Sequence, residues 1–190
     1  MSITANEVLD AKGLACPMPI VKTKKAIKNL EAGQVIEVQA TDKGSTADMK
    51  AWAESTGHQY LGTIDDGDVL KHYLRKASEE ETKGDTKHED VLDVEELRNK
   101  VEGEEAISII DVREPAEYGF GHIPGAVNIP LGELEERFEE LKKDQDIHVI
   151  CRTGSRSDLA AQKLTEKGFK SVKNIVPGMT NWKGPTEGNH

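Results

Sequence analysis

Ile147-His148-Val149-Ile150-Cys151-Arg152-Thr153-Gly154-Ser155-Arg156-Ser157 is the stretch that decides the fold of the second half of the chain. Its first residues form a short, mainly apolar run, which is typical of a strand covered on both faces. Gly154 indicates a loop, and the residues after it indicate a helix. Because ligands of open parallel sheets bind beyond the carboxyl ends of the strands, the position of Cys151 at such an end makes it a candidate functional residue.

The same alternation continues on both sides of this stretch. Short apolar runs bounded by charged or turn residues are separated by stretches with helical spacing. The pattern predicts an open, mainly parallel α/β sheet in residues 91–190, with strands at 106–112, 147–151 and 171–176 and helices at 133–141 and 157–167.

The first 77 residues have a different pattern. Pro17 and Pro19 fit the first turn of a helix but not its interior, so a helix is expected from about Pro17 to Leu30. The residues Asp65-Asp66-Gly67-Asp68 form a turn between two β-like runs, which indicates a hairpin. We therefore expect a two-layer α/β sandwich, with a further strand at 34–40, a helix at 46–56 and hairpin strands at 60–64 and 69–74.

Residues 78–90 separate the two patterns. They carry six acids against two bases and no apolar side chain, whereas residues 1–77 carry equal numbers of acids and bases. Such a segment cannot bury a face, so we interpret it as a solvated linker, with a charged helical connector as the alternative. The expected organisation is a first domain at 1–77, a linker at 78–90 and a second domain at 91–190.

Composition excludes several classes of protein. The chain has 190 residues, which permits one domain or two small ones, and it has no apolar run long enough for a membrane span or a signal peptide. A formal charge of −10 argues against general binding to nucleic acid or anionic membranes. The two cysteines form no Cys-x-x-Cys pair, so we expect free thiols, no metal and a cytoplasmic location.

The surroundings of Cys151 favour a reactive sulfur. A glycine-containing loop before a helix directs backbone N–H groups at one centre, and Arg152 and Arg156 add positive charge. This arrangement predicts a lowered pKa for the thiol and a cradle that could stabilise an attached anionic sulfur. The alternative is a cysteine that only packs in the core, because free cysteine is among the most buried residue types.

The second half resembles rhodanese domains, in which a loop cysteine carries sulfur as a persulfide. The resemblance rests on the six-residue loop from Cys151 to Arg156 and on three further stretches in the expected order. By resemblance, the persulfide on Cys151 would be held by Arg152, Thr153, Gly154, Ser155 and Arg156. The three stretches are Asp111-Val112-Arg113-Glu114 with Glu117-Tyr118, Gly121-His122-Ile123-Pro124-Gly125-Ala126-Val127-Asn128-Ile129-Pro130, and Pro177-Gly178-Met179 with Trp182.

Two details of the resemblance refine it. Many rhodanese domains have a glycine where this chain has Pro177, which leaves local backbone detail open but not the chemistry. Related phosphatases and arsenate reductases have a loop one residue longer, so the shorter loop here favours sulfur transfer over phosphate-ester hydrolysis. We expect Asp158, in the first turn of the following helix, to face solvent.

The other thiol, Cys16, directly precedes Pro17 and the first predicted helix. Unpaired N–H groups at a helix start are expected to lower its pKa, although a capping or packing cysteine is an alternative. This part of the chain resembles the signature of TusA-like sulfur carriers, whose cysteine receives and passes on persulfide sulfur. The matching residues are Leu9-Asp10-Ala11-Lys12-Gly13-Leu14-Ala15-Cys16-Pro17-Met18-Pro19. Asp42 and Asp48 lie where that family places acids.

Together these resemblances imply a sulfurtransferase. Cys151 would take sulfur from a small-molecule donor, thiosulfate or a persulfide, and exchange it with Cys16 for delivery to a protein or low-molecular-weight thiol. No cofactor is expected. Two alternatives remain: a redox or sulfide-stress sensor with a reversible Cys16–Cys151 disulfide, and an adaptor that serves only a protein acceptor.

Three other features receive smaller roles. Lys22, Lys24, Lys25 and Lys28 form a basic side of the first helix, interpreted as a solvated face or as a docking surface for an acidic partner. His122 is expected to be a structural hydrogen-bonding residue, and His148 is given no catalytic role.

Overall fold

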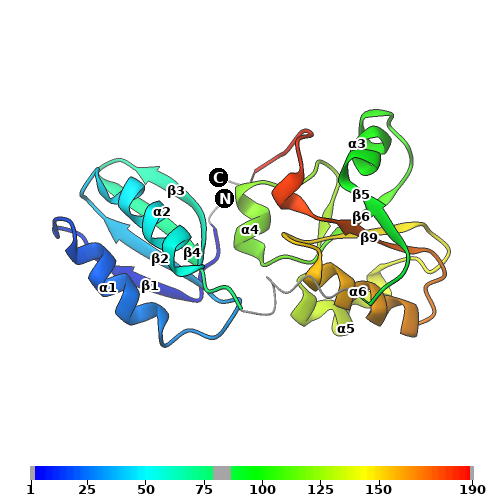
Figure 1. Cartoon of the computed structure of the whole chain (residues 1–190), viewed down its shortest axis with the longest axis horizontal. Helices are drawn as coiled ribbons and strands as arrows, with labels where there is room; N and C mark the ends of the chain where they lie inside the picture. The colour runs from blue at the N-terminus through cyan, green and yellow to red at the C-terminus, as the bar shows by residue number, and fades with distance from the viewer. Residues whose placement is uncertain (1–2, 79–86, 189–190) are drawn as a thin grey trace. The chain divides into compact units, whose positions relative to one another are not determined.

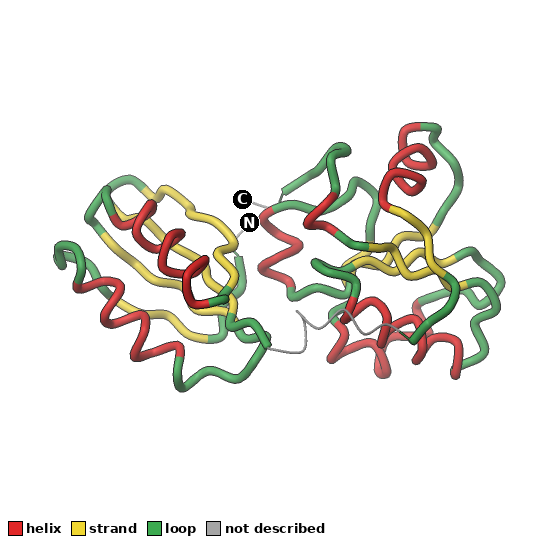
Figure 2. The backbone as a smooth tube through the Cα atoms, viewed as in Figure 1, coloured by secondary structure: helices red, strands yellow, loops and turns green. Residues whose placement is uncertain are grey.

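The computed structural model describes residues 3–78 and 87–188. These fall into two compact units, residues 3–78 and residues 87–188, and each is described here by itself (Figures 1 and 2). No helix among the described residues is long and apolar enough to cross a membrane.

The first unit is a four-stranded sheet covered on one face by two helices (Figure 1). The strand order is β1-β2-β4-β3, with β1 parallel to β2 and the other two pairings antiparallel. The hairpin expected around Gly67 is the β3–β4 pair. The elements are β1 (Glu7–Asp10), α1 (Met18–Ile27), β2 (Val35–Ala40), α2 (Ser45–Thr56), β3 (Gln59–Asp66) and β4 (Val69–Arg75).

Alternation along the strands places the core of the first unit between the sheet and the helices. On β2, Ile36 and Val38 are fully buried under the helices, whereas Glu37 between them points to the other face. Met49 and Ala53, one turn apart on α2, belong to the same buried cluster as Ile36 and Val38. Gly57 ends α2 in the left-handed conformation, as expected for a helix stop. The predicted two-layer sandwich is confirmed.

The second unit is an all-parallel, five-stranded sheet in the order β5-β9-β8-β6-β7 (Figure 1). Helices cover both faces, as the continuous apolar runs predicted. The strands are β5 (Val91–Asp93), β6 (Ser108–Asp111), β7 (Val127–Asn128), β8 (Ile147–Ile150) and β9 (Val172–Val176), and the α-helices are α3 (Val94–Glu102), α4 (Pro115–Phe120), α5 (Leu134–Arg137) and α6 (Ser155–Glu166).

Two apolar clusters lie on opposite faces of this sheet. One packs α5 and α6 against β6 and β8, and includes Val149 and Leu164. The other packs α3 against the opposite face, and includes Leu97 and Ile150. Because Val149 and Ile150 are neighbours on β8, they face opposite sides of the sheet, and both are fully buried.

The sequence prediction was incomplete in this unit. It gave no bounds for β5, β7, α3 or α4, which are short or amphipathic, and it placed a single helix at 133–141. That segment is instead α5 flanked by two 3₁₀ turns, at Leu131–Glu133 and Phe138–Glu140.

The expected linker falls mostly on residues 79–86, which lie outside the described residues. Its last residues are held on the second unit. The Lys87 and His88 N–H groups donate to the Asp158 carboxylate at 2.7–3.1 Å, and the Asp90 carbonyl accepts from Asn174 N–H at 2.9 Å. The sequence predicted that Asp158 faces solvent, and this prediction is wrong. Asp158 is buried, because its carboxylate receives these backbone N–H groups.

Candidate functional site

Cys151 directly follows β8, at the carboxyl end of a strand that pairs with β6 and β9. The chain then turns through Gly154, whose φ of +92° suits glycine, and enters α6. The Gly154 N–H donates to the Cys151 Sγ at 3.1 Å. The fully buried sulfur therefore faces a backbone donor at the amino end of a helix, where negative charge is stabilised.

A buried hydroxyl forms the second contact of this sulfur. Ser157 Oγ lies 3.3 Å from Cys151 Sγ and donates to Asn174 Oδ1 at 2.5 Å. The Asn174 amide in turn donates to the Gly154 carbonyl at 3.2 Å. Since this second bond fixes the orientation of the amide, the Ser157 hydroxyl has lone pairs directed at the thiol in this structure. It can accept from the S–H, or turn and donate to a thiolate.

The loop backbone is held from outside by the segment after β9. Met179 N–H donates to the Cys151 carbonyl at 2.8 Å, and Thr180 N–H donates to the Arg152 carbonyl at 3.1 Å. Gly178 lies against the same two carbonyls: a Cβ there would be 2.5 Å from the Cys151 oxygen and 2.8 Å from the Arg152 oxygen. This segment turns the carbonyls of the loop away from the sulfur, so that N–H groups can face it.

Arg156 has a different role from the one its sequence position suggests. We expected its guanidinium to hold the sulfur or its donor, but it is buried and forms a bidentate pair with Glu117 of α4, at 2.7 and 3.1 Å. The carboxylate lies in the same low-dielectric environment, which explains why the two charges pair instead of facing solvent. Arg152 and Thr153 are only half-buried, and Ser155 begins α6.

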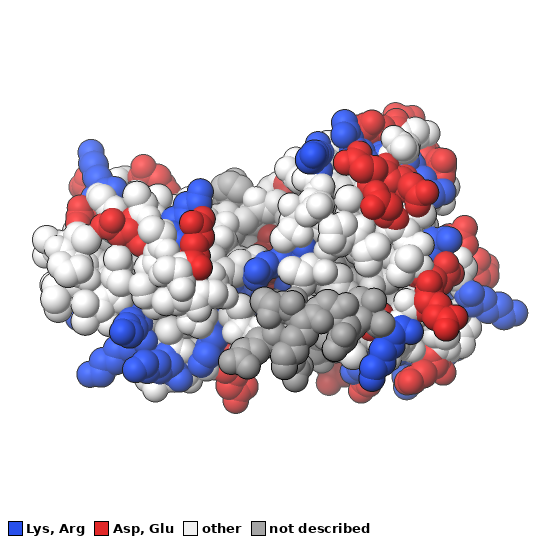
Figure 3. All heavy atoms as spheres, in the orientation of Figure 1, with Lys and Arg blue, Asp and Glu red and all other residues white. Residues whose placement is uncertain are grey.

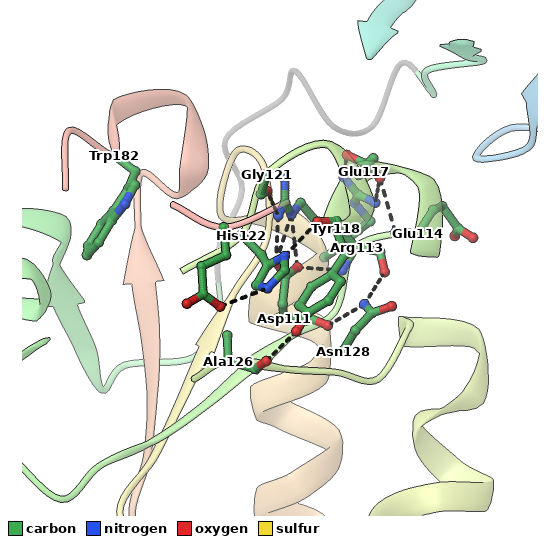
Figure 4. A network of polar contacts seen from close by, with 12 residues as sticks. Asp111, Arg113, Glu114, Glu117, Tyr118, Gly121, His122, Ala126, Asn128 and Trp182 are labelled. Carbon is green, nitrogen blue, oxygen red and sulfur yellow. Dashed lines mark hydrogen bonds and ion pairs between the residues drawn. The ribbon is translucent and has the colours of Figure 1, made fainter. Parts of the chain in front are cut away.

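A second buried pair lies beside the first (Figure 4). Arg113 binds both carboxylate oxygens of Asp111, at 2.6–3.1 Å, and donates to the Gly121 carbonyl at 2.8 Å. Desolvation by burial lowers the pKa of Arg113, but the hydrogen bonds to Asp111 and the negative charges of Asp111 and Glu117 together outweigh it, so the pKa is raised. The stretch 111–117 thus supplies the carboxylates and Arg113 for ion pairs that fix α4 and the loop from Cys151 to Arg156.

His122 and His148 are both buried. His122 stacks on Tyr118 with ring centroids 3.6 Å apart, and its Nδ1 bonds the Tyr118 carbonyl at 2.8 Å (Figure 4). His148 is buried on β8, where desolvation lowers its pKa.

Cys16 is exposed and surrounded by acids. Its N–H donates to Asp42 Oδ2 at 3.0 Å, and its Sγ donates to Asp48 Oδ2 at 2.7 Å. Asp48 lies in the first turn of α2, and Asp42 lies in the turn that precedes this helix. The fold therefore brings together three residues that are up to 32 positions apart in the sequence.

The acids reverse the expected pKa shift of Cys16. We predicted a lowered pKa from the start of α1, but the hydrogen bond to Asp48 raises it, with further contributions from desolvation and from the negative charges of Asp48 and Asp42. Ionisation would place a thiolate directly against a carboxylate, which is unfavourable. The two acids therefore favour the thiol form of Cys16 over the thiolate.

A buried hydrogen-bond chain supports the acidic turn. The Ser45 hydroxyl donates to the Asp42 carbonyl at 2.5 Å and lies 2.8 Å from His72 Nε2. Burial lowers the pKa of His72 to about 4, so its ring is neutral and carries one N–H. Because the single proton of Ser45 is already donated, His72 donates from Nε2 and accepts from Thr63 at Nδ1, 2.7 Å away.

Comparisons with known proteins agree with this arrangement. A family model described as sulfurtransferase TusA matches residues 7–76, and one described as a rhodanese-like domain matches residues 93–185. YrkF of Bacillus subtilis, described as a proposed sulfur carrier protein, is 54% identical over 183 residues, which cover 96% of this chain and 98% of that one. The chain belongs to the family that joins a TusA domain to a rhodanese domain. It is thus a protein of the sulfur-carrier and sulfurtransferase class.

Part of the chain also matches shorter proteins. The chain is 44% identical over 91 residues to YtwF of B. subtilis, described as a proposed sulfurtransferase, and the match covers 48% of this chain and 87% of that one. The solution structure of a rhodanese-like domain from Anabaena sp. matches with a TM-score of 0.50 and 34% identity, covering 53% of this chain and 80% of that one. The predicted fold of the rhodanese unit is confirmed.

Sequence reasoning assigned no role to several residues that contact the rhodanese loop. Ser157 and Asn174 touch the sulfur or its neighbour, and Glu117 binds Arg156, yet each is an ordinary polar residue in its own segment. Glu117 lies 39 positions before Arg156, and Asn174 lies 17 positions after Ser157. The sequence offers one weak signal, because Asn174 is a polar residue between the apolar residues of the strand β9, next to Lys173.

The contact between Asp48 and Cys16 in the TusA unit leads to a pH-dependent prediction. Replacing Asp48 with Asn removes the charge that disfavours the thiolate, so the pKa of Cys16 falls and more thiolate is present at pH 8. In a Cys151→Ser background, we expect iodoacetamide to alkylate Cys16 several times faster, with the rate profile shifted to lower pH. Glu54→Gln, the same charge change at an exposed site on α2, should leave the profile unchanged.

Proposed function

We propose that Cys151 is the residue that takes sulfur from a small-molecule donor and that Cys16 is the residue that carries it to an acceptor. The observation that supports this most is the position of the Cys151 sulfur, which follows β8 and faces the Gly154 N–H at the start of α6. This environment stabilises a negative sulfur without any metal or cofactor. Two free thiols also suit a reducing, cytoplasmic environment.

The first half-reaction forms a persulfide on Cys151. With thiosulfate, the Cys151 thiolate attacks the outer sulfur, the S–S bond of thiosulfate breaks, and sulfite leaves with the electron pair of that bond. The attached sulfur extends about 2 Å beyond Sγ, into the loop formed by Arg152, Thr153, Gly154 and Ser155. In this proposal Arg152 attracts the anionic donor, while Arg156 positions the loop through Glu117.

The second half-reaction passes the sulfur to Cys16. The Cys16 sulfur attacks the outer sulfur of the Cys151 persulfide, the bond between the two Cys151 sulfurs breaks, and Cys151 is released as a thiol. Cys16 then holds the persulfide for a protein or low-molecular-weight thiol acceptor. Because the cycle consists of two half-reactions through a covalent intermediate, ping-pong kinetics are expected.

Two variants test the assignment of roles. We expect Cys151→Ser to abolish transfer of sulfur from thiosulfate to cyanide, whereas Cys16→Ser leaves this small-molecule reaction largely intact. Intact-mass analysis of both variants after incubation with thiosulfate should show one added sulfur on Cys151 but not on Cys16. Full turnover by Cys151→Ser would refute the proposal. A loss of two protons from the mass of the wild-type chain after mild peroxide would support a disulfide sensor instead.

A further inference from the structure

The two thiols of this chain lie in opposite electrostatic environments. Cys16 Sγ is 2.7 Å from Asp48, and the Cys16 N–H is 3.0 Å from Asp42. The charges that act on the Cys16 thiol are those of these two acids, and both oppose its ionisation. At Cys151 the sulfur contacts an N–H and a hydroxyl, and the nearby Glu117 is neutralised by Arg156.

The basic groups near the start of α1 do not cancel the two acids at the sulfur. Lys12 lies 3.9 Å from Asp10, so it has an acid of its own. Lys22, Lys24, Lys25 and Lys28 are exposed along α1, where Figure 3 shows basic side chains gathered, and none of them is among the groups that shift the pKa of Cys16. An approaching ligand therefore meets basic charge along the helix but carboxylates at the thiol itself.

We propose that Asp48, assisted by Asp42, is a specificity determinant that keeps small anionic sulfur donors away from Cys16. The inference rests on the proposed function of Cys16 as a carrier. A dianion such as thiosulfate is repelled at the site of attack in every protonation state it has near neutral pH, whereas a persulfide in its protonated form, R–S–SH, whose outer sulfur is the electrophile, is not. Cys16 is thereby reserved for persulfide sulfur, and small anionic donors are left to Cys151.

The transfer that the acids permit is balanced without another reactant. The Cys16 sulfur attacks the outer sulfur of R–S–SH, the bond between the donor sulfurs breaks, and R–S⁻ leaves. Asp48, already bonded to the thiol, accepts the Cys16 proton as the new S–S bond forms. That proton ends on the departing R–S⁻, so the products are a Cys16 persulfide and R–SH, and Asp48 returns to its ionised state.

The test compares two alkylating reagents of similar size but different charge. In the Cys151→Ser chain, the rate with iodoacetate is divided by the rate with iodoacetamide. Because both reagents react with the same thiolate, this ratio cancels any change in the pKa of Cys16 and reports the local charge alone. Removing one charge about 4 Å away in water changes such a ratio by about fivefold.

We expect Asp48→Asn to raise the ratio about fivefold, and Asp42→Asn to raise it less. Glu54→Gln, on the same helix but away from the thiol, should leave the ratio unchanged. High salt should reduce the difference between wild type and Asp48→Asn, because it screens exposed charges. Equal ratios for wild type, Asp48→Asn and Glu54→Gln would overturn the proposal.

A second measurement tests whether the acids that set the alkylation ratio also set the rate of sulfur transfer from thiosulfate to Cys16. In the Cys151→Ser chain, we expect thiosulfate to add sulfur to Cys16 faster in Asp48→Asn than in wild type, by intact mass. An unchanged thiosulfate rate beside a raised alkylation ratio would show that the acids do not govern donor choice, and so would overturn the proposal. The alkylation ratio requires no sulfur transfer, so failure of the proposed function would be seen separately.

Discussion

Replacing Glu117 with Met is expected to destabilise the rhodanese unit by about 3–5 kcal/mol. The substitution leaves the Arg156 guanidinium buried without its bidentate partner, beside a second buried guanidinium, Arg113. The carboxylate also accepts the Glu114 N–H at 3.2 Å, in the capping box that begins α4. Loss of one side chain therefore removes an ion pair and a helix cap together.

Urea unfolding measures this effect. Trp182 lies in the rhodanese unit, so its fluorescence in a Trp52→Phe background reports that unit alone. The double variant Glu117→Met, Arg156→Met removes both buried charges and should be more stable than the Glu117→Met single variant. As a control, Glu135→Gln breaks the exposed pair with Lys163 and should cost less than about 1 kcal/mol.

The same variants separate two roles for Arg156. If Arg156 acts through Glu117, then Glu117→Met should impair persulfide formation on Cys151 at temperatures where the unit is still folded. Normal stability and normal persulfide formation in Glu117→Met would show that the buried pair neither stabilises the unit nor positions the loop.

The sequence predicted those parts of the fold that depend on local pattern. The apolar run at 147–150 and the glycine at 154 indicate a strand, a loop and a helix without reference to any distant residue. The proline pair after Cys16 and the glycine at 57 similarly mark the beginning of α1 and the end of α2. These features are set by backbone geometry, which a short stretch of sequence determines.

Predictions failed where a side chain takes its partner from a distant segment. Arg156 resembled an anion-binding residue, and Asp158 resembled a solvent-facing acid, because their partners Glu117 and residues 87–88 are 39 and about 70 positions away. The sequence prediction considered only the start of α1 and therefore expected a lowered pKa for Cys16. The carboxylate that raises this pKa belongs to Asp48, which lies on α2. A local sequence pattern identifies a charged side chain, but the tertiary fold determines which groups that side chain contacts.

The loop from Cys151 to Arg156 also depends on a close approach of two backbones. Gly178→Ala places a Cβ 2.5 Å from the Cys151 carbonyl oxygen and 2.8 Å from that of Arg152, at a φ of +105°. Both carbonyls are backbone atoms, so the overlap is relieved only by moving the loop or the 178–180 segment. Strain at a positive φ and this overlap together should cost at least about 3 kcal/mol.

Gly168→Ala is a matched control within the same unit. Its φ is +95°, close to that of Gly178, but a Cβ there meets only the flexible end of Lys143, at 3.7 Å. It should therefore cost about 1 kcal/mol, the strain of the backbone conformation alone. The difference between the two variants, measured by Trp182 fluorescence in urea, isolates the overlap with the Cys151 loop.

Persulfide formation on Cys151 should also be impaired more by Gly178→Ala than by Gly168→Ala. Because the 178–180 segment turns the Cys151 and Arg152 carbonyls away from the sulfur, displacing it removes the constraint that lets N–H groups face a persulfide. We expect Gly178→Ala to reduce persulfide formation on Cys151 from thiosulfate at least tenfold under conditions where both variants remain folded, whereas Gly168→Ala should retain it. Equal destabilisation and equal activity in the two variants would mean that the backbone contact at residue 178 does not shape the sulfur site.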